Sequence, residues 1–197
     1  MRNSTDSRNS VLIVSDSEKL NTFVQKILSE NKNPEAVFKK SASTARREIL
    51  TRAYDLVIIN TPLPDETGID LALDLSEQGT GIVLLCVSGE VAEEVRSRVS
   101  DYGIMVSAKP VSKPVLSKQV RYLFAIRDKI RKVEKKAQSL EEKMEELRTV
   151  NRAKWLLITK ENLSEEKAHA KIMKTAMDSC ISKRLVAEEI IDRYKEY

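Results

Sequence analysis

The feature that most constrains the fold of this chain is an apolar pattern in its second half that repeats every seven residues. Between residues 123 and 147 the apolar residues alternate at spacings of three and four. The a positions of this repeat are Leu123, Ile130, Ala137 and Met144, and the d positions are Ile126, Val133, Leu140 and Leu147. Four heptads in one register predict a long helix that pairs with another helix as a coiled coil.

The charged residues beside this repeat favour two parallel helices. In a parallel dimer each g position faces the next e position of the partner, so Lys129 would face Glu134 and Lys136 would face Glu141. Asn151 at the following a position suits a two-stranded coil of fixed register. We therefore predict a homodimer through a parallel coiled coil. The alternative is one long helix packed on its own chain, although the sequence offers no second helix of that length.

The first half of the chain has a different pattern, in which short apolar runs alternate with amphipathic stretches. Strands are predicted at residues 11–14, 36–38, 56–59, 82–87 and 103–106. Helices are predicted between them, among others at residues 18–30, 42–51 and 91–100. Apolar strands separated by helices form a parallel sheet that is covered on both faces. The pattern predicts an α/β domain with a five-stranded, doubly wound parallel sheet.

The C-terminal segment predicts a small three-helix all-α domain. The coil helix continues to residue 158, a second helix follows Ser164, and a third follows Ser182. Serine suits the N-cap position in both places. We expect a disordered tail over residues 1–9, the α/β domain over 10–113, the coiled-coil helix over 114–150 and the α-helical domain over 151–197.

Charge and cysteine content restrict the class of function. Residues 114–197 hold 20 Lys and Arg against 14 Asp and Glu, whereas residues 1–113 hold 14 against 16. An excess of basic residues is expected in a segment that meets a polyanion. The two cysteines and the one histidine lack metal-ligand spacing, so we expect no metal and no cofactor. Isolated cysteines, no membrane-spanning apolar stretch and no signal peptide predict a cytoplasmic protein.

The α/β domain resembles the receiver domain of bacterial response regulators. The resemblance rests on residues after four of the predicted strands, namely Ser15-Asp16, Asn60, Ser88-Gly89 and Lys109-Pro110. In that family an aspartate at the position of Asn60 accepts a phosphoryl group, and two acidic residues at the positions of Ser15 and Asp16 help it to hold Mg²⁺.

The departures from the receiver pattern predict a degenerate pocket. An amide is a poor nucleophile for phosphoryl transfer, and one carboxylate is fewer than Mg²⁺ expects. We expect Ser15, Asp16, Asn60, Ser88 and Lys109 to form this pocket, with Lys109 paired to Asp16. Phosphorylation at Asp16 or at another nearby residue stays open. The input would then be a regulatory partner protein, a small ligand or concentration alone.

The C-terminal segment resembles the ANTAR domain of transcription antitermination regulators. The matching residues are 151–154, 156–157, 163–168, 176–177, 185–187 and 190–191, and the order of receiver, coil and ANTAR domain is that of the family. The resemblance implies a dimer that binds paired hairpins in a leader transcript and prevents a terminator from forming. Basic, aromatic and small side chains suit hairpin loops. The candidate RNA contacts are Arg152, Lys154, Lys160, His169, Lys171, Lys174, Ala176 and Met177.

Several of these residues have a structural interpretation as well. The lysines also fit a solvated helix face, and Ala176 and Met177 also fit the core of a small domain. Trp155 stands where the family often has glycine; we expect it to fill the core, with stacking on a base as the alternative. We expect no enzyme activity, because His169 has neither a nucleophile nor an acid as a partner.

One departure supports a second hypothesis. Asp178, Ser179 and Cys180 stand where the family commonly has arginines, which weakens the phosphate-binding surface. The protein would then be a protein-interaction signalling module with a degenerate receiver and no RNA binding.

Overall fold

The computed structural model describes residues 9–30 and 34–194, and these residues fall into two compact units that divide between residues 130 and 131. Residues 1–8 of the predicted tail lie outside the described residues. Asn9 is described, and its carbonyl accepts a hydrogen bond from the backbone N–H of Glu35 at 2.9 Å.

The first unit is built on a five-stranded parallel sheet, as predicted. Its strands are β1 (Ser10–Val14), β2 (Glu35–Lys39), β3 (Leu56–Asn60), β4 (Ile82–Ser88) and β5 (Met105–Lys109). Their order in the sheet is β2-β1-β3-β4-β5. All four neighbouring pairs are parallel, and the register places Leu12 beside Val57 and Asn60 beside Cys86. The change of strand order beside β1 is the point where open sheets of this kind place their functional pocket.

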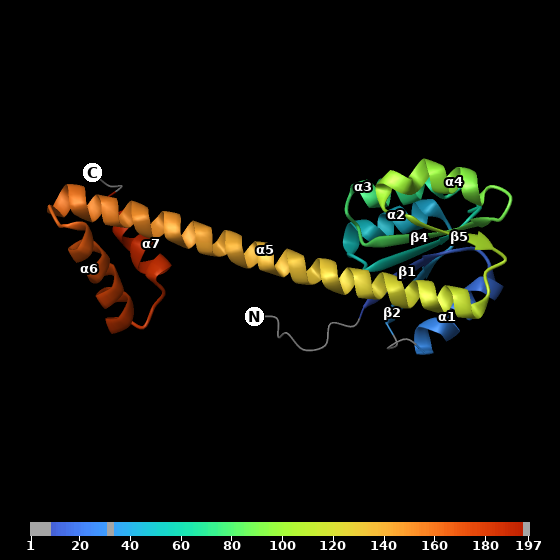
Figure 1. Ribbon diagram of the computed structural model, residues 1–197, viewed down its shortest axis with the longest axis horizontal. Helices are drawn as coiled ribbons and strands as arrows, with labels where there is room; N and C mark the ends of the chain where they lie inside the picture. Colours follow the sequence, from blue (N-terminus) through green and yellow to red (C-terminus); the bar gives the residue numbers. More distant parts are fainter. Residues whose placement is uncertain (1–8, 31–33, 195–197) are drawn as a thin grey trace. The chain divides into compact units, whose positions relative to one another are not determined.

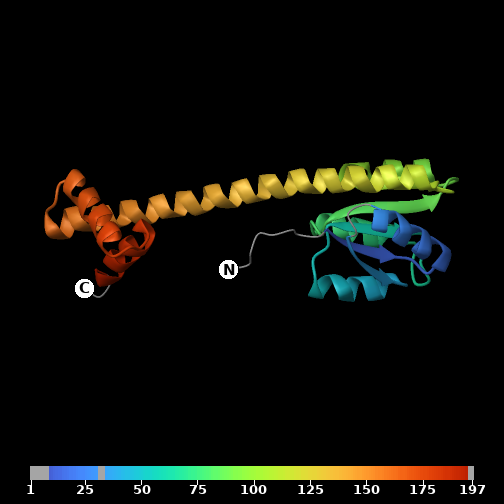
Figure 2. The ribbon, with the colours of Figure 1, turned by 90° about the horizontal axis from the view of Figure 1, so that it is seen from below.

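Helices cover both faces of the sheet (Figure 1). α2 (Ala42–Thr51), α3 (Ile69–Glu77) and α4 (Ala92–Val99) lie on one face, and α1 (Glu18–Glu30) lies on the other with the first turns of α5 (Lys113–Glu161). Figure 2 shows the same arrangement seen from below.

Two buried layers result from this cover. Successive residues of a strand point to opposite faces, so Leu12 enters the layer beneath α2, α3 and α4, and Ile13 enters the layer beneath α1 and α5. The doubly wound prediction is therefore confirmed.

The last strand begins later than the sequence predicts. Residues 100–102 form a short 3-10 helix, and Gly103 follows it with a φ of +67°. This left-handed conformation ends the helix and is incompatible with a strand, so β5 starts at Met105 and not at Gly103.

The second unit contains the end of α5 with α6 (Glu165–Asp178) and α7 (Lys183–Arg193). The predicted caps are confirmed, because the Ser164 hydroxyl accepts from the N–H of Lys167 and the Ser182 hydroxyl accepts from that of Leu185. The buried core of the unit combines apolar residues of the three helices, among them Ala153, Leu157, Ile172, Ala187 and Ile190. None of the helices in the described part of the chain combines the length and the apolar character that crossing a membrane requires.

Candidate functional site

The degenerate pocket lies at the edge of the sheet where the parallel strands end. Asn60 is the last residue of β3, and its Nδ2 donates to the Ser15 hydroxyl at 3.2 Å. Lys109 is the last residue of β5, and its ammonium donates to Asn60 Oδ1 at 3.2 Å and to the carbonyl of Thr61. Ser15, Asn60 and Lys109 therefore form one hydrogen-bonded network with a neutral amide at its centre. Ser88, the last residue of β4, is exposed beside this network.

The predicted ion pair between Lys109 and Asp16 is wrong. Asp16 is exposed, whereas its neighbour Ser15 is only 1 % exposed. The Ser15 hydroxyl accepts from the backbone N–H of Ser17 at 3.1 Å, which fixes a tight turn with the intervening Asp16 on the outside. The ammonium of Lys109 instead donates to the oxygens of Asn60 and Thr61.

The residues of this pocket do not fit Mg²⁺, which typical receivers bind here. Mg²⁺ requires near-octahedral oxygen ligands, with carboxylates among them. Asp16 is the one carboxylate of the predicted set and is exposed, and the amide oxygen of Asn60 already accepts from an ammonium. Within residues 9–30 and 34–194, no three His, Cys, Asp or Glu side chains are grouped so that they could hold a metal ion.

The loop after β3 is held in place by a carboxylate. Asp65 accepts hydrogen bonds from the backbone N–H groups of Ala42 and Ser43, both at 2.9 Å. These bonds lower the pKa of Asp65, because they stabilise its charged form at the N-terminus of α2. The loop that follows Asn60 is thereby tied to a rigid helix.

Cys86 of β4 is part of the buried layer and is chemically protected. Burial raises the pKa of its thiol to about 11, although the nearby charge of Lys109 opposes this shift. The thiol is therefore protonated near neutral pH and is not a nucleophile.

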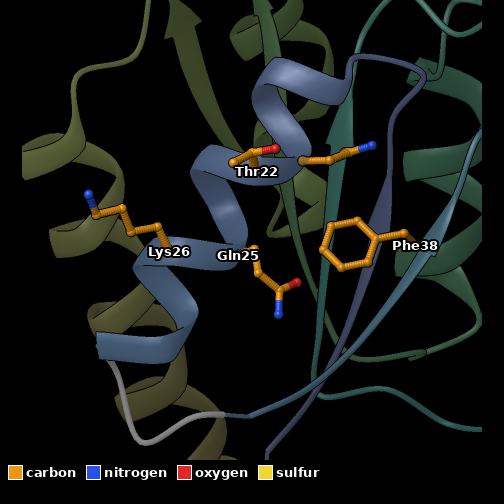
Figure 3. A pocket seen from close by; sticks show the side chains of 5 residues that line it. Thr22, Gln25, Lys26 and Phe38 are labelled. Carbon is orange, nitrogen blue, oxygen red and sulfur yellow. The ribbon is translucent and has the colours of Figure 1, made fainter.

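Two hollows flank α1, and the sequence analysis missed both. One, of about 710 Å³, continues outward from the pocket and has Leu20, Phe23 and Val111 on its walls. The other, of about 460 Å³, lies between α1 and β2, where the ring of Phe38 faces the side chain of Gln25 (Figure 3). Leu20 and Phe23 have the spacing of a helix face that packs on a core. A single sequence does not distinguish a residue half-buried at a cleft from one fully buried.

In the second unit, the predicted RNA contacts fall into two groups. Arg152, Lys160, His169 and Lys174 are exposed, and no ion pair engages them in the described part of the chain. Lys154 and Lys171, in contrast, form ion pairs with Glu165 (at 3.1 Å) and Glu161, respectively. Glu161 also accepts from the hydroxyl of Tyr194, and the two donors, Lys171 first, lower the pKa of this carboxyl.

The two apolar residues among the predicted RNA contacts differ in exposure. Ala176 is 8 % exposed and belongs to the core, whereas Met177 is 73 % exposed. Both line a hollow of about 300 Å³ beside the turn between α6 and α7.

The prediction that Trp155 fills the core is wrong, because this side chain is 62 % exposed. The core face of α5 carries Val150, Ala153 and Leu157, and the helical period of 3.6 residues places Trp155 on the opposite face.

The predicted coiled-coil stripe on α5 is exposed over most of its length. Val133, Leu140, Met144 and Leu147 are between 50 % and 66 % exposed, and Ile130 is 38 % exposed. Ala137 is exposed and Ile126 is half-buried. Leu123, which the heptad pattern places at the start of the seam, is 2 % exposed and packs in the sheet core under α1. The apolar surface available to a partner therefore starts after Leu123.

Comparison with known families agrees with this arrangement. The response regulator receiver domain family matches residues 11–121, and the ANTAR domain family matches residues 138–191. The chain belongs to the response regulators that carry a receiver domain and an ANTAR domain, which are transcription regulators of the antiterminator type. This family is regulatory and is not a known class of enzyme.

Individual proteins similar to this chain include one transcriptional regulatory protein and several solved receiver domains. The transcriptional regulatory protein PdtaR of Mycobacterium tuberculosis (strain H37Rv) is 31 % identical over 140 residues, which span 70 % of this chain and 67 % of PdtaR. Two solved receiver domains share the fold of the first unit. One, from an HD domain-containing protein of Pseudomonas fluorescens Pf-5, has a TM-score of 0.58 at 22 % identity and covers 67 % of this chain and 98 % of its own. The other, from Methanospirillum hungatei JF-1, has a TM-score of 0.55 at 20 % identity and covers 62 % of this chain and 98 % of its own.

Proposed function

We propose that this protein binds hairpins in nascent transcripts as a parallel coiled-coil dimer and thereby prevents termination. The observation that carries the proposal is the exposure of unpaired basic side chains within the ANTAR match, namely Arg152, Lys160, His169 and Lys174. Such side chains bind phosphate without first breaking an ion pair. We assign a smaller contribution to Lys154 and Lys171, because each already has a carboxylate partner.

The hollow beside α6 supports contact with an unpaired base. Met177 presents a flexible apolar side chain there, and the small side chain of Ala176 allows close approach. Bases in hairpin loops are unstacked, so their faces pack on apolar or aromatic surfaces.

The exposed stripe on α5 supports dimerisation through Val133, Leu140, Met144 and Leu147. An apolar stripe with heptad spacing is buried when two helices pair. A dimer holds two RNA-binding units together, and on a transcript with two hairpins the second contact then forms at a high effective concentration.

The pocket supports control that is independent of phosphorylation at the β3 position. An amide stands at this position, and the ammonium of Lys109 occupies its oxygen. Acetyl phosphate with Mg²⁺ is expected to leave the mass of the intact protein unchanged, and a gain of one phosphoryl group would contradict this part of the proposal.

An RNA-binding assay tests the central claim. A tandem-hairpin RNA is titrated with the full chain at about 50 mM and 200 mM salt, and the affinity is expected to fall steeply as counterions compete. Arg152→Ala is expected to weaken binding about tenfold and to lower the salt dependence by about one ion. Arg96→Ala, which removes an exposed arginine of α4, is the matched control and is expected to bind like the wild type. Wild-type affinity of a folded Arg152→Ala variant would remove this residue from the site.

One observation favours a second candidate, a protein-interaction module without RNA binding. Asp178, Ser179 and Cys180 are exposed and contribute no positive charge, while Met177 before them and Leu185 of α7 expose apolar surface. A folded dimer with no salt-sensitive affinity for tandem hairpins would favour this candidate over the first.

A further inference from the structure

The cleft that opens from the degenerate pocket has the size and the lining of a small-molecule site. Its volume of about 710 Å³ lies within the range of ligand pockets. Its polar floor is formed at the strand ends by Asn60, Ser88 and Lys109, and its apolar wall by Leu20, Phe23 and Val111. The cleft lies entirely within the first unit.

The charge of the cleft is suited to an anion. Two lysines, Lys19 and Lys109, line it, and no Asp or Glu does so among the described residues. An ammonium has three hydrogen-bond donors, and the oxygens of Asn60 and Thr61 use two of those on Lys109. One donor is left for a ligand, and the exposed hydroxyl of Ser88 offers another.

The apolar wall favours a ligand with an apolar part over an inorganic ion. Leu20 and Phe23 are half-buried and lie three residues apart, on one face of α1. Val111, just after β5, is half-buried as well. A bare ion on the polar floor would leave these three side chains uncovered, whereas a ligand with an apolar body would bury them.

We propose that this cleft binds a small organic anion. Its charged head is held by Lys109 and Ser88 at the strand ends, and its apolar body packs on Leu20, Phe23 and Val111. The ligand would take the place that a phosphoryl group takes in typical receivers. The proposal is independent of RNA binding by the C-terminal unit.

Titration of the full chain followed by amide NMR shifts tests the proposal. The probes are phenyl phosphate and phenylacetate, which share a ring and differ in the charged head; inorganic phosphate and phenol supply each half alone. At least one of the two aromatic anions is expected to bind about tenfold more tightly than either half, because both parts of the cleft contribute. The shifts are expected at Leu20, Phe23, Ser88 and Val111, and whichever anion binds identifies the head group.

Three results would overturn the proposal. The first is no saturable binding of either aromatic anion. The second is binding of inorganic phosphate or phenol as tight as that of the tighter of the two aromatic anions. The third is a set of shifts confined to Thr22, Gln25 and Phe38, which line the other hollow on α1.

Two variants locate the site. Lys109→Met removes the ammonium but keeps an apolar stem, and it is expected to weaken binding about tenfold or more, as for the loss of a charge-assisted hydrogen bond. Lys118→Met, at an exposed position of α5 outside the cleft, is the matched control. Val111→Glu leaves the strand-end network intact and places a negative charge at the cleft, so it is expected to reduce anion binding even if Lys109→Met fails to fold. Wild-type affinity of a folded Lys109→Met or Val111→Glu variant would contradict the proposal.

Discussion

Asp55, at the amino end of β3, is a buried carboxylate that joins three parts of the receiver unit. Its side chain is 5 % exposed. It accepts from the backbone N–H of Ser10 at 2.8 Å, from the Ser10 hydroxyl at 3.1 Å and from Nε of Arg127 at 3.4 Å. Arg127 lies on α5 and is itself only 20 % exposed. The carboxylate therefore ties both β1 and α5 to the centre of the sheet.

Asp55→Ala is expected to destabilise this unit by about 3 kcal/mol, the typical cost of removing one partner of a buried ion pair. The cost arises because the guanidinium of Arg127 and the N–H of Ser10, both partly buried, lose this carboxylate as an acceptor. Glu35→Ala is the matched control. It breaks the bidentate pair with Arg52, whose side chains are 36 % (Arg52) and 57 % (Glu35) exposed, and it is expected to cost less than about 1 kcal/mol.

Hydrogen exchange of the β1 amides measures the effect in the full chain. A loss of about 3 kcal/mol corresponds to about a hundredfold faster exchange of the most protected amides, and the control is expected to stay within about fivefold of the wild type. Equal exchange rates in the two variants would refute the argument, because the buried pair would then contribute no more than the exposed one.

Three further predictions follow from exposure and charge. Leu140→Lys places a charge in the proposed dimer seam, and sedimentation is expected to show monomers; an unchanged dimer mass would exclude this seam. Under native conditions a thiol reagent is expected to modify exposed Cys180 and to reach buried Cys86 only on unfolding; two fast thiols would contradict the burial. Hydrogen bonds, chiefly from Lys171, lower the pKa of Glu161, so the charged carboxylate stabilises the C-terminal unit above pH 4.5. This stability is lost as the pH falls through the lowered pKa of Glu161. In acid unfolding, Glu161→Gln is expected to flatten this pH dependence of stability.

Much of the fold could be predicted because its patterns are local. The bounds of α1 and α2 agree with the predicted helices, since apolar spacing specifies the helix face and Ser41 caps α2. The convergence of Ser15, Asn60 and Lys109 could be predicted from the topology alone, because parallel strands end at the same edge.

The remaining features depend on distances that a sequence pattern does not contain. The predicted pairing of Lys109 with Asp16 is wrong because the turn at Ser15 directs Asp16 outward. An apolar residue at a heptad position gives the same sequence pattern whether it packs on its own sheet or on a second chain. The heptad pattern therefore gives Leu123 and Leu140 the same role. A large apolar side chain predicts burial, whereas helical phase places Trp155 on the face of α5 opposite Ala153 and Leu157.

The burial of Ser15 also limits what substitutions in this pocket can achieve. Changing Asn60 to aspartate would restore the missing acceptor, but the new carboxylate would lie beside Lys109 and would lack a second acidic neighbour inside the pocket. Supplying that neighbour at Ser15 would mean burying another charge at a position that is 1 % exposed and already accepts two hydrogen bonds. A pocket with two inward carboxylates would thus require at least two substitutions, and the second buried charge would lie beside the first.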